Sequence, residues 1–362
     1  MAKQKTHAQV GKRVIELSNL DKVLYPADPD AGHEAITKAQ IIQYYLQLAP
    51  TILNHIRGRA LSLIRFPDGI YEEQFFQKHR PDWTPDWIDY KRLGQERQKE
   101  YVVAKEEATL VWLANLACLE IHQIHSFAEK SDKPDYIVYD LDPPDSYREE
   151  DGLDRLKDLA FRLKEHLERH NYHVFVKTTG GKGLHVVTPL EPKYSFDECF
   201  EAAKAIAQPF VQKNADTTLH IKKEARKGRV LIDIYRNRPS QTIVAPYSLR
   251  GRAGAPASTP ITWEELEELE KLNDWNIETT AERVLNEGDA WESIRGWAVP
   301  LHTDRSAVVA KDMPPNPRHK TPEQLAEYEK KRDFKKTPEP PSILDEAPGS
   351  RFCIQRHHAS HL

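Results

Sequence analysis

The order of the elements that the sequence predicts between residues 135 and 236 limits the fold more than any other feature. The runs "DYIVYDL", "HVFVK", "LHVVTPL" and "RVLIDIYR" are short, apolar and β-branched, as strands are. The stretch "LDRLKDLAFRLKEHL" repeats its leucines at helical spacing, and "FDECFEAAKAIAQPFVQK" is a second helix, in which we expect Pro209 to mark a break. A glycine turn, "TTGGKG", separates the second and third strands.

Read in order, these elements give β-α-β-β-α-β, the split unit of ferredoxin-like and RNA-recognition-motif-like domains. That unit folds with the spatial strand order 4-1-3-2, so the first strand lies between the third and the fourth and runs antiparallel to both. Asp140 and Asp142 end the first strand, His185 begins the third, and Asp233 lies early in the fourth. Antiparallel neighbours bring such positions to one end of the sheet, and we expect these four side chains to converge there.

Three carboxylates predict a metal site at this end of the sheet. Asp140 and Asp142 are two residues apart in a strand and therefore face the same side, whereas Asp145 lies beyond two prolines, outside this alternation. Carboxylates on one face repel each other unless cations neutralise them, and oxygen ligands suit Mg²⁺ or Mn²⁺. Two such ions support in-line attack at phosphorus. An isolated Asp-x-Asp is more often a turn or a helix cap, but the convergence with Asp233 favours metal binding.

The glycine turn and two arginines predict a phosphate site next to these carboxylates. In "TTGGKGLH" the glycines let backbone N–H groups approach an anion, Lys182 adds a charge and Thr179 a hydroxyl. The spacing is not that of a Walker A loop, and the alternative is a plain hairpin turn. Arg236 and Arg250 follow Asp233, and they suit triphosphate oxygens or simply balance the acidic side chains.

The rest of the chain predicts an additional α/β region and a polar tail, which makes the fold class α+β. Between Arg13 and Lys130 we expect a helix from Lys38, strand-like runs at "ALSLIRF" and "TLVWLANL", and a long surface loop, "HRPDWTPDWIDYKRLGQERQKE". Adjacent aromatics in "EQFFQKH", Phe75 and Phe76, would point to opposite faces of a strand, one into the core and one free to stack on a base. After residue 262 the chain turns helical, and residues 301–349 are a linker rich in proline and charge.

Composition narrows the class of function. The 362 residues carry a net charge of -4, which argues against a protein that simply coats nucleic acid. The basic run Lys222 to Arg229 suits a small anionic target, such as a nucleotide or a DNA end, or is a solvated surface loop. Three separate cysteines, no long apolar span and no apolar signal segment predict a cytoplasmic, nucleoid-associated protein in a reducing compartment.

At these residues the chain resembles the polymerase module of bacterial ligase D, a member of the archaeo-eukaryotic primase superfamily. The resemblance covers about residues 10–300 and rests on motifs that occur in the same order, among them "LSNLDKVLYP", "RFPDG", "EQFFQKH", "LANLACLEIH", "YIVYDLDPP", "TTGGKGLHVVTPL" and "LIDIYRNRPSQTIVAPYSLRGRAGAPASTP". It implies a primase-polymerase domain over residues 1–300. Within this domain, an RRM-like catalytic sheet (about 131–255) would pack with an N-terminal α/β region.

The resemblance also implies a role for each residue at the predicted site. Asp140, Asp142 and Asp233 match the catalytic, metal-binding carboxylates, and the segment "ADPDAGHEA" before Lys38 is longer than the family's pattern. The basic run 222–229 matches a mobile active-site loop. The residues that match the nucleotide site are His122, Thr179 (a serine in most relatives), Lys182, His185, Arg236, Arg250, Phe75 and Phe76. The residues that match the pocket for the 5′-phosphate of downstream DNA are Asn19, Lys22 and Lys38.

The implied activity is a two-metal nucleotidyltransferase that extends primer 3′ ends and fills gaps at double-strand breaks in non-homologous end joining. The resemblance further implies a preference for ribonucleotides, two Mn²⁺ (or Mg²⁺) ions, DNA with a 5′-phosphorylated end or gap, NTP or dNTP substrates, and Ku and a DNA ligase as partners. One alternative is a primase that makes primers de novo in replication or damage tolerance. Another is a non-catalytic module that binds or aligns DNA ends.

A second resemblance lies in the tail. "RDFKKTPEP" and "RFCIQRHHASHL" resemble the start of the 3′-phosphoesterase module of the same ligases, truncated within residues 350–362. That module's motif continues with a further His and an Asp, which the sequence does not contain after Leu362. His357 would therefore lack its metal-binding partners, and we expect no phosphoesterase activity.

Overall fold

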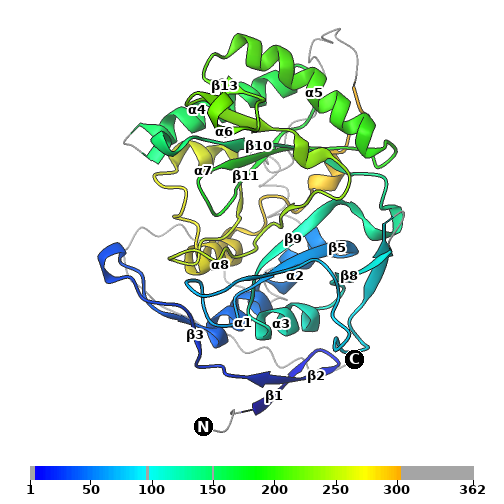
Figure 1. Ribbon diagram of the computed structural model, residues 1–362, viewed down its shortest axis with the longest axis vertical. Helices are drawn as coiled ribbons and strands as arrows, with labels where there is room; N and C mark the ends of the chain where they lie inside the picture. Colours follow the sequence, from blue (N-terminus) through cyan, green and yellow to red (C-terminus); the bar gives the residue numbers. More distant parts are fainter. Residues whose placement is uncertain (1–4, 95–97, 149–150, 303–362) are drawn as a thin grey trace, which may run out of the picture. The chain divides into compact units, whose positions relative to one another are not determined.

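The computed structural model describes residues 5–94, 98–148 and 151–302, and the account below concerns these residues (Figure 1). They belong to one compact unit, residues 1–310, and the second unit, residues 311–362, lies outside the described part. From residue 303 onward, the predicted linker and the predicted start of a phosphoesterase-like module also lie outside it.

The first sheet has the strand order β13-β14-β10-β12-β11-β16. Its four central strands are β14 (Val230–Asp233), β10 (Tyr136–Asp142), β12 (Leu184–Pro189) and β11 (Phe175–Thr178). This confirms the order 4-1-3-2, with β10 antiparallel to both of its neighbours. Two short edge strands extend the sheet, β13 (Thr217–Thr218), which is parallel to β14, and β16 (Pro260–Ile261).

Two long helices pack against one face of this sheet (Figure 1). Helix α4 (Gly152–Glu168) buries Leu156, Leu159, Ala160 and Leu163, the stripe that the sequence predicts. Helix α5 (Phe196–Lys213) begins with a capping box between Ser195 and Glu198. The expected break at Pro209 is wrong, because α5 continues through this residue to Lys213. Its buried residues, such as Phe200 and Phe210, pack in the core of the sheet and hold the helix together across the proline.

The central strand β10 is completed by a side chain as well as by its neighbours. Strand β14 pairs with it only from Asp140 to Asp142. Beyond that point the chain turns into the 3₁₀-helix Tyr235–Asn237, and the amide of Asn237 takes the place of a strand. It accepts from the N–H of Val138 (2.8 Å) and donates to its carbonyl (2.7 Å). The buried strand therefore leaves neither of these backbone groups unsatisfied.

The second sheet has the order β15-β9-β5-β8-β7, and β6 (Phe75–Gln77) also pairs with β5 (Arg59–Arg65). The expected strand at "TLVWLANL" is wrong, because these residues form helix α3 (Glu107–Asn115). Every residue from Ala108 to Ala114 is buried, and a helix that is apolar all round cannot be told from a buried strand by its periodicity. The region is also not confined to residues 13–130, since β15 (Ile243–Val244) joins β9 (Cys118–Phe127) from later in the chain.

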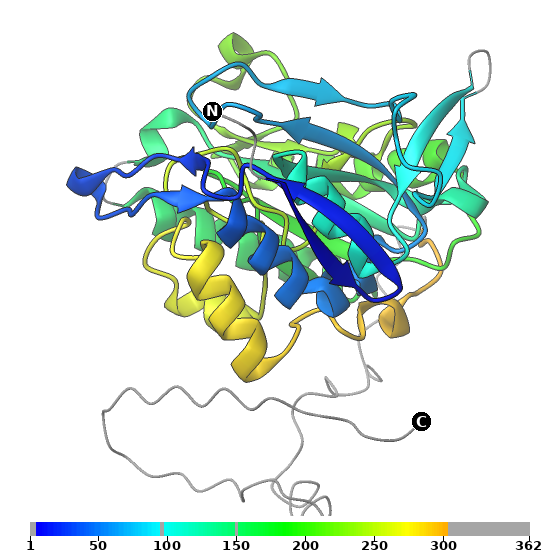
Figure 2. The ribbon, with the colours of Figure 1, turned by 90° about the horizontal axis from the view of Figure 1, so that it is seen from below.

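Two further predictions in this region need correction. The helix expected from Lys38 is two helices, α1 (Lys38–Gln47) and α2 (Ala49–Ile56), because Pro50 suits the first turn of a new helix. The expected surface loop after Phe76 ends in strand β7 (Tyr90–Leu93), which pairs with β8 (Lys99–Val103). The helical region after residue 262 is confirmed by α7 (Trp263–Glu268) and α8 (Ile277–Glu287), and Figure 2 shows α8 beside α1.

The remaining elements are short. Strands β1 (Lys5–Val10) and β2 (Arg13–Ser18) form a hairpin, and β3 (Val23–Tyr25) pairs with β4 (Ile36–Thr37). Helix α6 is the single turn Lys223–Arg226, and the other 3₁₀-helices are Pro29–Ala31, Ala128–Lys130, Asp145–Arg148 and Ile294–Trp297. Among the described helices, none is both long enough and apolar enough to cross a membrane.

A buried ion pair links the two sheets. Arg59, at the start of β5, donates from both terminal nitrogens to the carboxylate of Asp135, just before β10, at 2.7 and 2.5 Å. The backbone of Asp135 also bonds to His125 of β9 and to Leu190 after β12. The guanidinium lies 4.5 Å from the ring centroid of Phe127. Both charged side chains are almost inaccessible, so each depends on the other for its neutralisation.

We predict that Asp135→Asn lowers the free energy of unfolding by about 3–5 kcal/mol, because it leaves the Arg59 charge buried without a counter-ion. Denaturant unfolding measures this loss. The control is Glu168→Gln, which removes a helix-surface pair with Lys164 and is expected to cost about 0.5 kcal/mol or less. A loss for Asp135→Asn as small as that of the control would contradict the role assigned to the pair.

Candidate active site

One row of side chains crosses the first sheet and forms the floor of the site. In the strand register, Asp140 lies directly opposite Asp233 of β14 on one side and His185 of β12 on the other. His185 in turn lies opposite Lys177 of β11. Residues that oppose each other in antiparallel strands share a face of the sheet, so all four side chains point the same way. The convergence of Asp140, Asp233 and His185 that the sequence predicts is confirmed, and Lys177 extends it.

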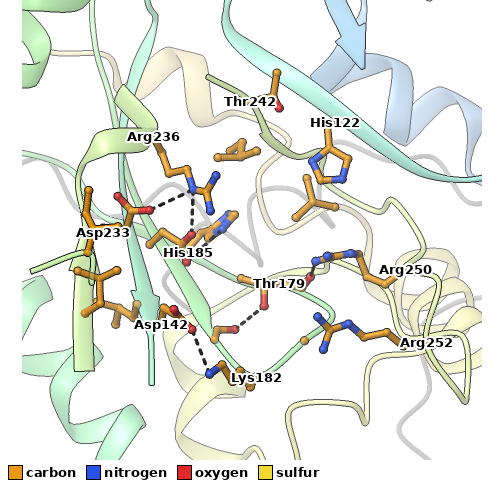
Figure 3. A pocket seen from close by; sticks show the side chains of 18 of the residues that line it. His122, Asp142, Thr179, Lys182, His185, Asp233, Arg236, Thr242, Arg250 and Arg252 are labelled. Carbon is orange, nitrogen blue, oxygen red and sulfur yellow. Dashed lines mark hydrogen bonds and ion pairs between the residues drawn. The ribbon is translucent and has the colours of Figure 1, made fainter. Parts of the chain in front are cut away.

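Each carboxylate of the predicted triad is paired with cationic groups. Arg236 Nε lies 3.3 Å from both Asp140 Oδ2 and Asp233 Oδ2, and so bridges the two carboxylates (Figure 3). Asp142 Oδ2 contacts Arg226 Nη1 at 2.7 Å, while its Oδ1 lies 3.4 Å from Lys182 Nζ. His185 Nε2 lies 3.6 Å from Asp140 Oδ1. The three carboxylates are thus gathered at one end of the sheet and neutralised there by the protein's own cations.

The pKa values of these groups follow from burial and from one another. Burial favours the neutral form of Asp140, but His185 and Arg236 outweigh it and lower the pKa of this carboxyl below its ordinary value. For Asp233 burial dominates, with smaller contributions from Asp140 and Asp142, and the pKa is raised despite Arg236. Burial lowers the pKa of His185 to about 4 and holds that of Lys177 well below its ordinary range. The carboxylates therefore act on one another electrostatically, as close neighbours do.

An open cleft of about 580 Å³ lies over this row. It contains eight of the eleven residues predicted to bind metal or nucleotide: Asp140, Asp142, Asp233, His122, Thr179, Lys182, His185 and Arg236. Arg250 and Phe76 also line it, and Phe75 does not. Figure 3 shows the cationic side chains of Arg236, Arg250, Arg252 and Lys182 around the cleft. A cleft with carboxylates on its floor and guanidinium groups around it suits a polyanion that arrives with divalent cations.

The glycine turn between β11 and β12 is shaped by close backbone contacts. Thr179 closes it with two bonds to the carbonyl of Gly183, from its N–H (3.2 Å) and its Oγ1 (3.0 Å). Gly180 has φ +62°, and a Cβ there would lie 2.6 Å from Cγ of Arg250. A Cβ on Gly183 would lie 2.3 Å from the carbonyl oxygen of Leu141, between the two aspartates of β10. The turn therefore needs glycine to sit this close to the carboxylates and to Arg250.

Two predictions about neighbouring side chains are resolved by their surroundings. His122 lines the cleft, whereas His125 is fully buried and stacks on Tyr136 with ring centroids 4.9 Å apart. The expectation that either Phe75 or Phe76 enters the core is wrong, because they are 46% and 63% exposed. Strand β6 is an edge strand beside β5, so both of its faces reach the surface, and Phe76 faces the cleft.

The residues predicted to hold a 5′-phosphate lie together at the start of β3 and α1. Asn19 has φ +52°, and its carbonyl accepts from the N–H of Lys22 (3.1 Å). The N–H of Lys38 in turn donates to the carbonyl of Lys22 (2.9 Å). Lys38 Nζ is directed inward to the carbonyls of Ser18 and Asn115, both at 2.9 Å, while Lys22 Nζ pairs with the exposed Asp68 at 2.5 Å. Lys22 is therefore the ammonium of this group that is better placed to meet a ligand.

The donor set of the triad fits a hard divalent cation, although its side chains are not arranged around one. Among the described residues, no group of three or more His, Cys, Asp or Glu side chains is disposed to hold a metal ion. The reason lies in the contacts above, since Arg236 bridges Asp140 and Asp233 while Arg226 and Lys182 hold Asp142. Three carboxylates on one face that repel each other are nevertheless a ligand set for Mg²⁺ or Mn²⁺. Binding would require that Arg226 and Arg236 turn away.

Some residues of the site escape sequence reasoning. Arg226 lies in the basic run 222–229, which the sequence marks as a loop but not as a ligand of Asp142. Arg252 and Thr242 also line the cleft. Lys177 stands directly before the glycine turn, where a strand pattern gives no sign that an ammonium is fully buried. Glu120 lies in the quoted "LANLACLEIH", yet only the fold shows that it joins His122 to Arg250.

Comparison with known proteins supports this description of the site. The family model of the LigD primase-polymerase domain matches residues 37–291. The multifunctional non-homologous end joining protein LigD of Mycolicibacterium smegmatis is 31% identical over 356 residues, which are 96% of this chain and 42% of that protein. The bifunctional non-homologous end joining protein LigD of Bacillus subtilis is 29% identical over 278 residues, which are 76% of this chain and 43% of that protein. The chain thus spans less than half the length of these relatives.

A solved structure shows the same fold. The polymerase domain of Mycobacterium tuberculosis ligase D, in complex with DNA, superposes with a TM-score of 0.69 at 29% identity. The match covers 79% of this chain and 99% of that domain. It confirms the predicted archaeo-eukaryotic primase fold, in which an RRM-like catalytic sheet packs with further helices and strands.

We predict that Gly183→Ala disrupts the site, because its methyl group would push the β12 turn away from β10 between Asp140 and Asp142. We expect a loss of about 1–3 kcal/mol in unfolding free energy, measured by denaturation, and weaker binding of Mn²⁺ and nucleotide, measured by calorimetry. Gly296→Ala is the matched control, because a Cβ at Gly296 meets no atom within 4 Å. Unchanged binding in Gly183→Ala would contradict the close packing described here.

Proposed function

Because the chain belongs to the family of LigD primase-polymerase domains, we propose that it is a DNA-directed nucleotidyltransferase that extends primer 3′ ends and fills short gaps during the repair of double-strand breaks. The observation that carries this proposal is the register of the first sheet. It places Asp140 opposite Asp233, with Asp142 two residues on, beneath a cleft lined by Arg236, Arg250 and Lys182. Carboxylates for metal and cations for phosphate are the two requirements of nucleotidyl transfer.

The family implies two Mn²⁺ or Mg²⁺ ions, which Asp140, Asp142 and Asp233 would hold. When bound, such ions lower the pKa of an attacking hydroxyl and neutralise the charge that develops on a leaving pyrophosphate. The primer 3′-hydroxyl would attack the α-phosphate of the nucleotide, and the bond from that phosphorus to the bridging oxygen of the pyrophosphate would break. Arg250 and Lys182, on the opposite side of the cleft from Asp233, would hold the triphosphate oxygens in position for in-line attack (Figure 3).

The contacts in the site bear on how it would be activated. Arg226 and Arg236 neutralise the carboxylates while neither metal nor nucleotide is bound. Binding of the metal would release both guanidinium groups, and the arriving triphosphate offers them new anionic partners. Arg226 belongs to the short helix α6, which is joined to β14 by Lys227 and Gly228, both with positive φ. This segment is a suitable place for such a rearrangement, since few of its residues are buried.

The finer features of the proposal concern substrates and partners. Phe76, exposed at the edge of the cleft, would stack on a base of the template or the nucleotide. The pocket formed by Asn19, Lys22 and Lys38 would bind the 5′-phosphate at the far side of a gap. The relatives are named for non-homologous end joining, and the resemblance adds a preference for ribonucleotides and joint action with Ku and a DNA ligase. A primase that starts strands de novo would share the carboxylates but would have no use for a 5′-phosphate pocket.

We predict that the purified protein with Mn²⁺ and nucleotides extends the primer of a 5′-phosphorylated gapped duplex, and that Asp140→Ala reduces this activity at least a thousandfold, because one side of the metal-ligand set is lost. Gel-resolved primer extension measures both. Asp158→Ala, on the exposed face of α4, is the matched control and should retain activity. Absence of extension by the unaltered protein would contradict the proposed function, and extension of an unprimed template would favour the primase alternative.

We predict that Lys22→Ala abolishes the advantage that a downstream 5′-phosphate gives to gap filling, because Lys22 is the ammonium of the pocket closest to the surface. Rates are compared on gapped duplexes with and without the phosphate, and on a simple overhang, where the variant should match the unaltered protein. Lys204→Ala, an exposed lysine on α5, serves as the control for loss of a positive charge. Equal losses on all three substrates would show that the pocket is not where we place it.

A further inference from the structure

Glu120 lies at the centre of a network that joins the two sheets at the edge of the cleft. It is a residue of β9 and is only 5% exposed. Its Oε2 lies 3.0 Å from His122 Nε2 and 3.1 Å from Arg250 Nε, and its Oε1 accepts from the N–H of Gly251 at 3.0 Å. A single buried carboxylate therefore holds two residues of the cleft and the backbone of the loop that carries one of them.

The charge on Glu120 is secured by these partners. Burial alone would raise the pKa of this carboxyl, but the hydrogen bond with His122 and the charge of Arg250 outweigh it and lower the pKa to about 2. Glu120 is thus ionised at neutral pH. An ionised carboxylate only accepts hydrogen bonds, so the His122 nitrogen that faces it, Nε2, must carry a hydrogen.

His122 itself is neutral. Burial lowers the pKa of the imidazole below its ordinary value, and the opposing effect of Glu120 does not cancel this. A neutral imidazole has one N–H and one bare nitrogen. With the hydrogen on Nε2, the bare nitrogen is Nδ1, which has no bond to any described side chain and belongs to a ring that lines the cleft.

The chemistry of that nitrogen decides what it can bind. Phosphate oxygens are acceptors and suit the donors of Arg250, Arg252 and Lys182, but a bare imidazole nitrogen repels them. It suits a hydroxyl, which can donate. In a nucleoside triphosphate, the donors next to the phosphates are the sugar hydroxyls.

We propose that Glu120 is a positioning residue that fixes His122 as the tautomer with a bare Nδ1, so that the cleft accepts a hydrogen bond from a sugar hydroxyl of the incoming nucleotide. This inference rests on the proposed function and supplies a physical basis for discrimination between ribose and deoxyribose. Through the same carboxylate, Arg250 is held against the glycine turn, where its Nη1 donates to the carbonyl of Thr179 at 2.6 Å. The sugar-binding and phosphate-binding sides of the cleft are thus set by one side chain.

Glu120→Gln is the variant that tests the inference, because it keeps the shape and removes the charge. If the new amide oxygen keeps the bond to the N–H of Gly251, the amide NH₂ faces His122 Nε2, which must then accept. The ring changes tautomer, and Nδ1 carries a hydrogen into the cleft. If the amide is turned the other way, two donors meet at Gly251. Both orientations disturb the network.

The matched control is Glu265→Gln. Glu265 is also a largely buried carboxylate, bound to Arg283 at 2.7 and 2.9 Å and to the N–H of Thr262 at 2.6 Å, but it is not part of the cleft. Its loss should cost stability in the same way and leave the choice of nucleotide unchanged.

The experiment measures kcat/KM for insertion of one nucleotide into a gapped duplex with ribo-, 2′-deoxy- and 3′-deoxynucleoside triphosphates. We expect Glu120→Gln to reduce the preference for the ribonucleotide over one of the two deoxy analogues by about tenfold, the worth of one hydrogen bond, and Glu265→Gln to leave both ratios unchanged. The analogue affected identifies the hydroxyl. Equal loss with all three nucleotides would show a merely structural role and overturn the inference.

A second measurement needs neither variant nor substrate. A nitrogen–proton correlation spectrum of the histidine rings in the unaltered protein should show His122 with its hydrogen on Nε2 and a bare Nδ1. A hydrogen on Nδ1 would overturn the inference whether or not the protein polymerises nucleotides. If the spectrum agrees but no nucleotide is inserted, the proposed function fails while the assignment of the tautomer stands.

Discussion

The antiparallel pairing of β10 with β12 and β14 is the constraint on which the rest of the site depends. It sets Asp140 directly opposite both Asp233 and His185, and no other register of these strands would do so. A slip of one residue would turn Asp140 and Asp142 to the helix-covered face, where the buried core of α4 and α5 has no place for a charge. The packing of that core therefore selects the register that gathers the carboxylates.

Charge balance is the second theme of the molecule. The carboxylates of the cleft are neutralised by Arg226, Arg236 and Lys182, so the folded chain tolerates them without an external cation. The pair Arg59–Asp135 and the Glu120 network follow the same rule in the interior. The difference lies in access, because the carboxylate partners in the cleft can be exchanged for ligands while the interior pairs cannot. In our account, function begins with that exchange.

Much of the catalytic sheet could be predicted from the sequence, because alternating strands and two helical stripes leave few arrangements. The convergence of Asp140, Asp233 and His185 followed from topology alone. Helix α3 could not be recognised, since it is buried on all sides and its apolar run has no period that separates helix from strand. Strand β15 joins its sheet from more than 100 residues away, and local patterns carry no such information.

The parts of the site that escaped prediction share a physical cause. Arg226, Lys177 and Glu120 act through partners distant in the chain, and their residue types occur just as often on solvated surfaces. The exposure of Phe75 depended on β6 being an edge strand, which only the sheet order reveals. The resemblance to ligase D supplied the roles of His122, Arg250 and Lys22, and the structure adds how the first two are held in place.

The most direct test of the central claim is a crystal structure of the protein with Mn²⁺ and a non-hydrolysable nucleoside triphosphate, in which anomalous scattering locates the metal. The account predicts manganese peaks bound by Asp140, Asp142 and Asp233, with the guanidinium groups of Arg226 and Arg236 displaced from these carboxylates and the triphosphate against Arg250 and Lys182. Bound nucleotide with no manganese at the three carboxylates, or with Arg226 and Arg236 still in place between them, would contradict it.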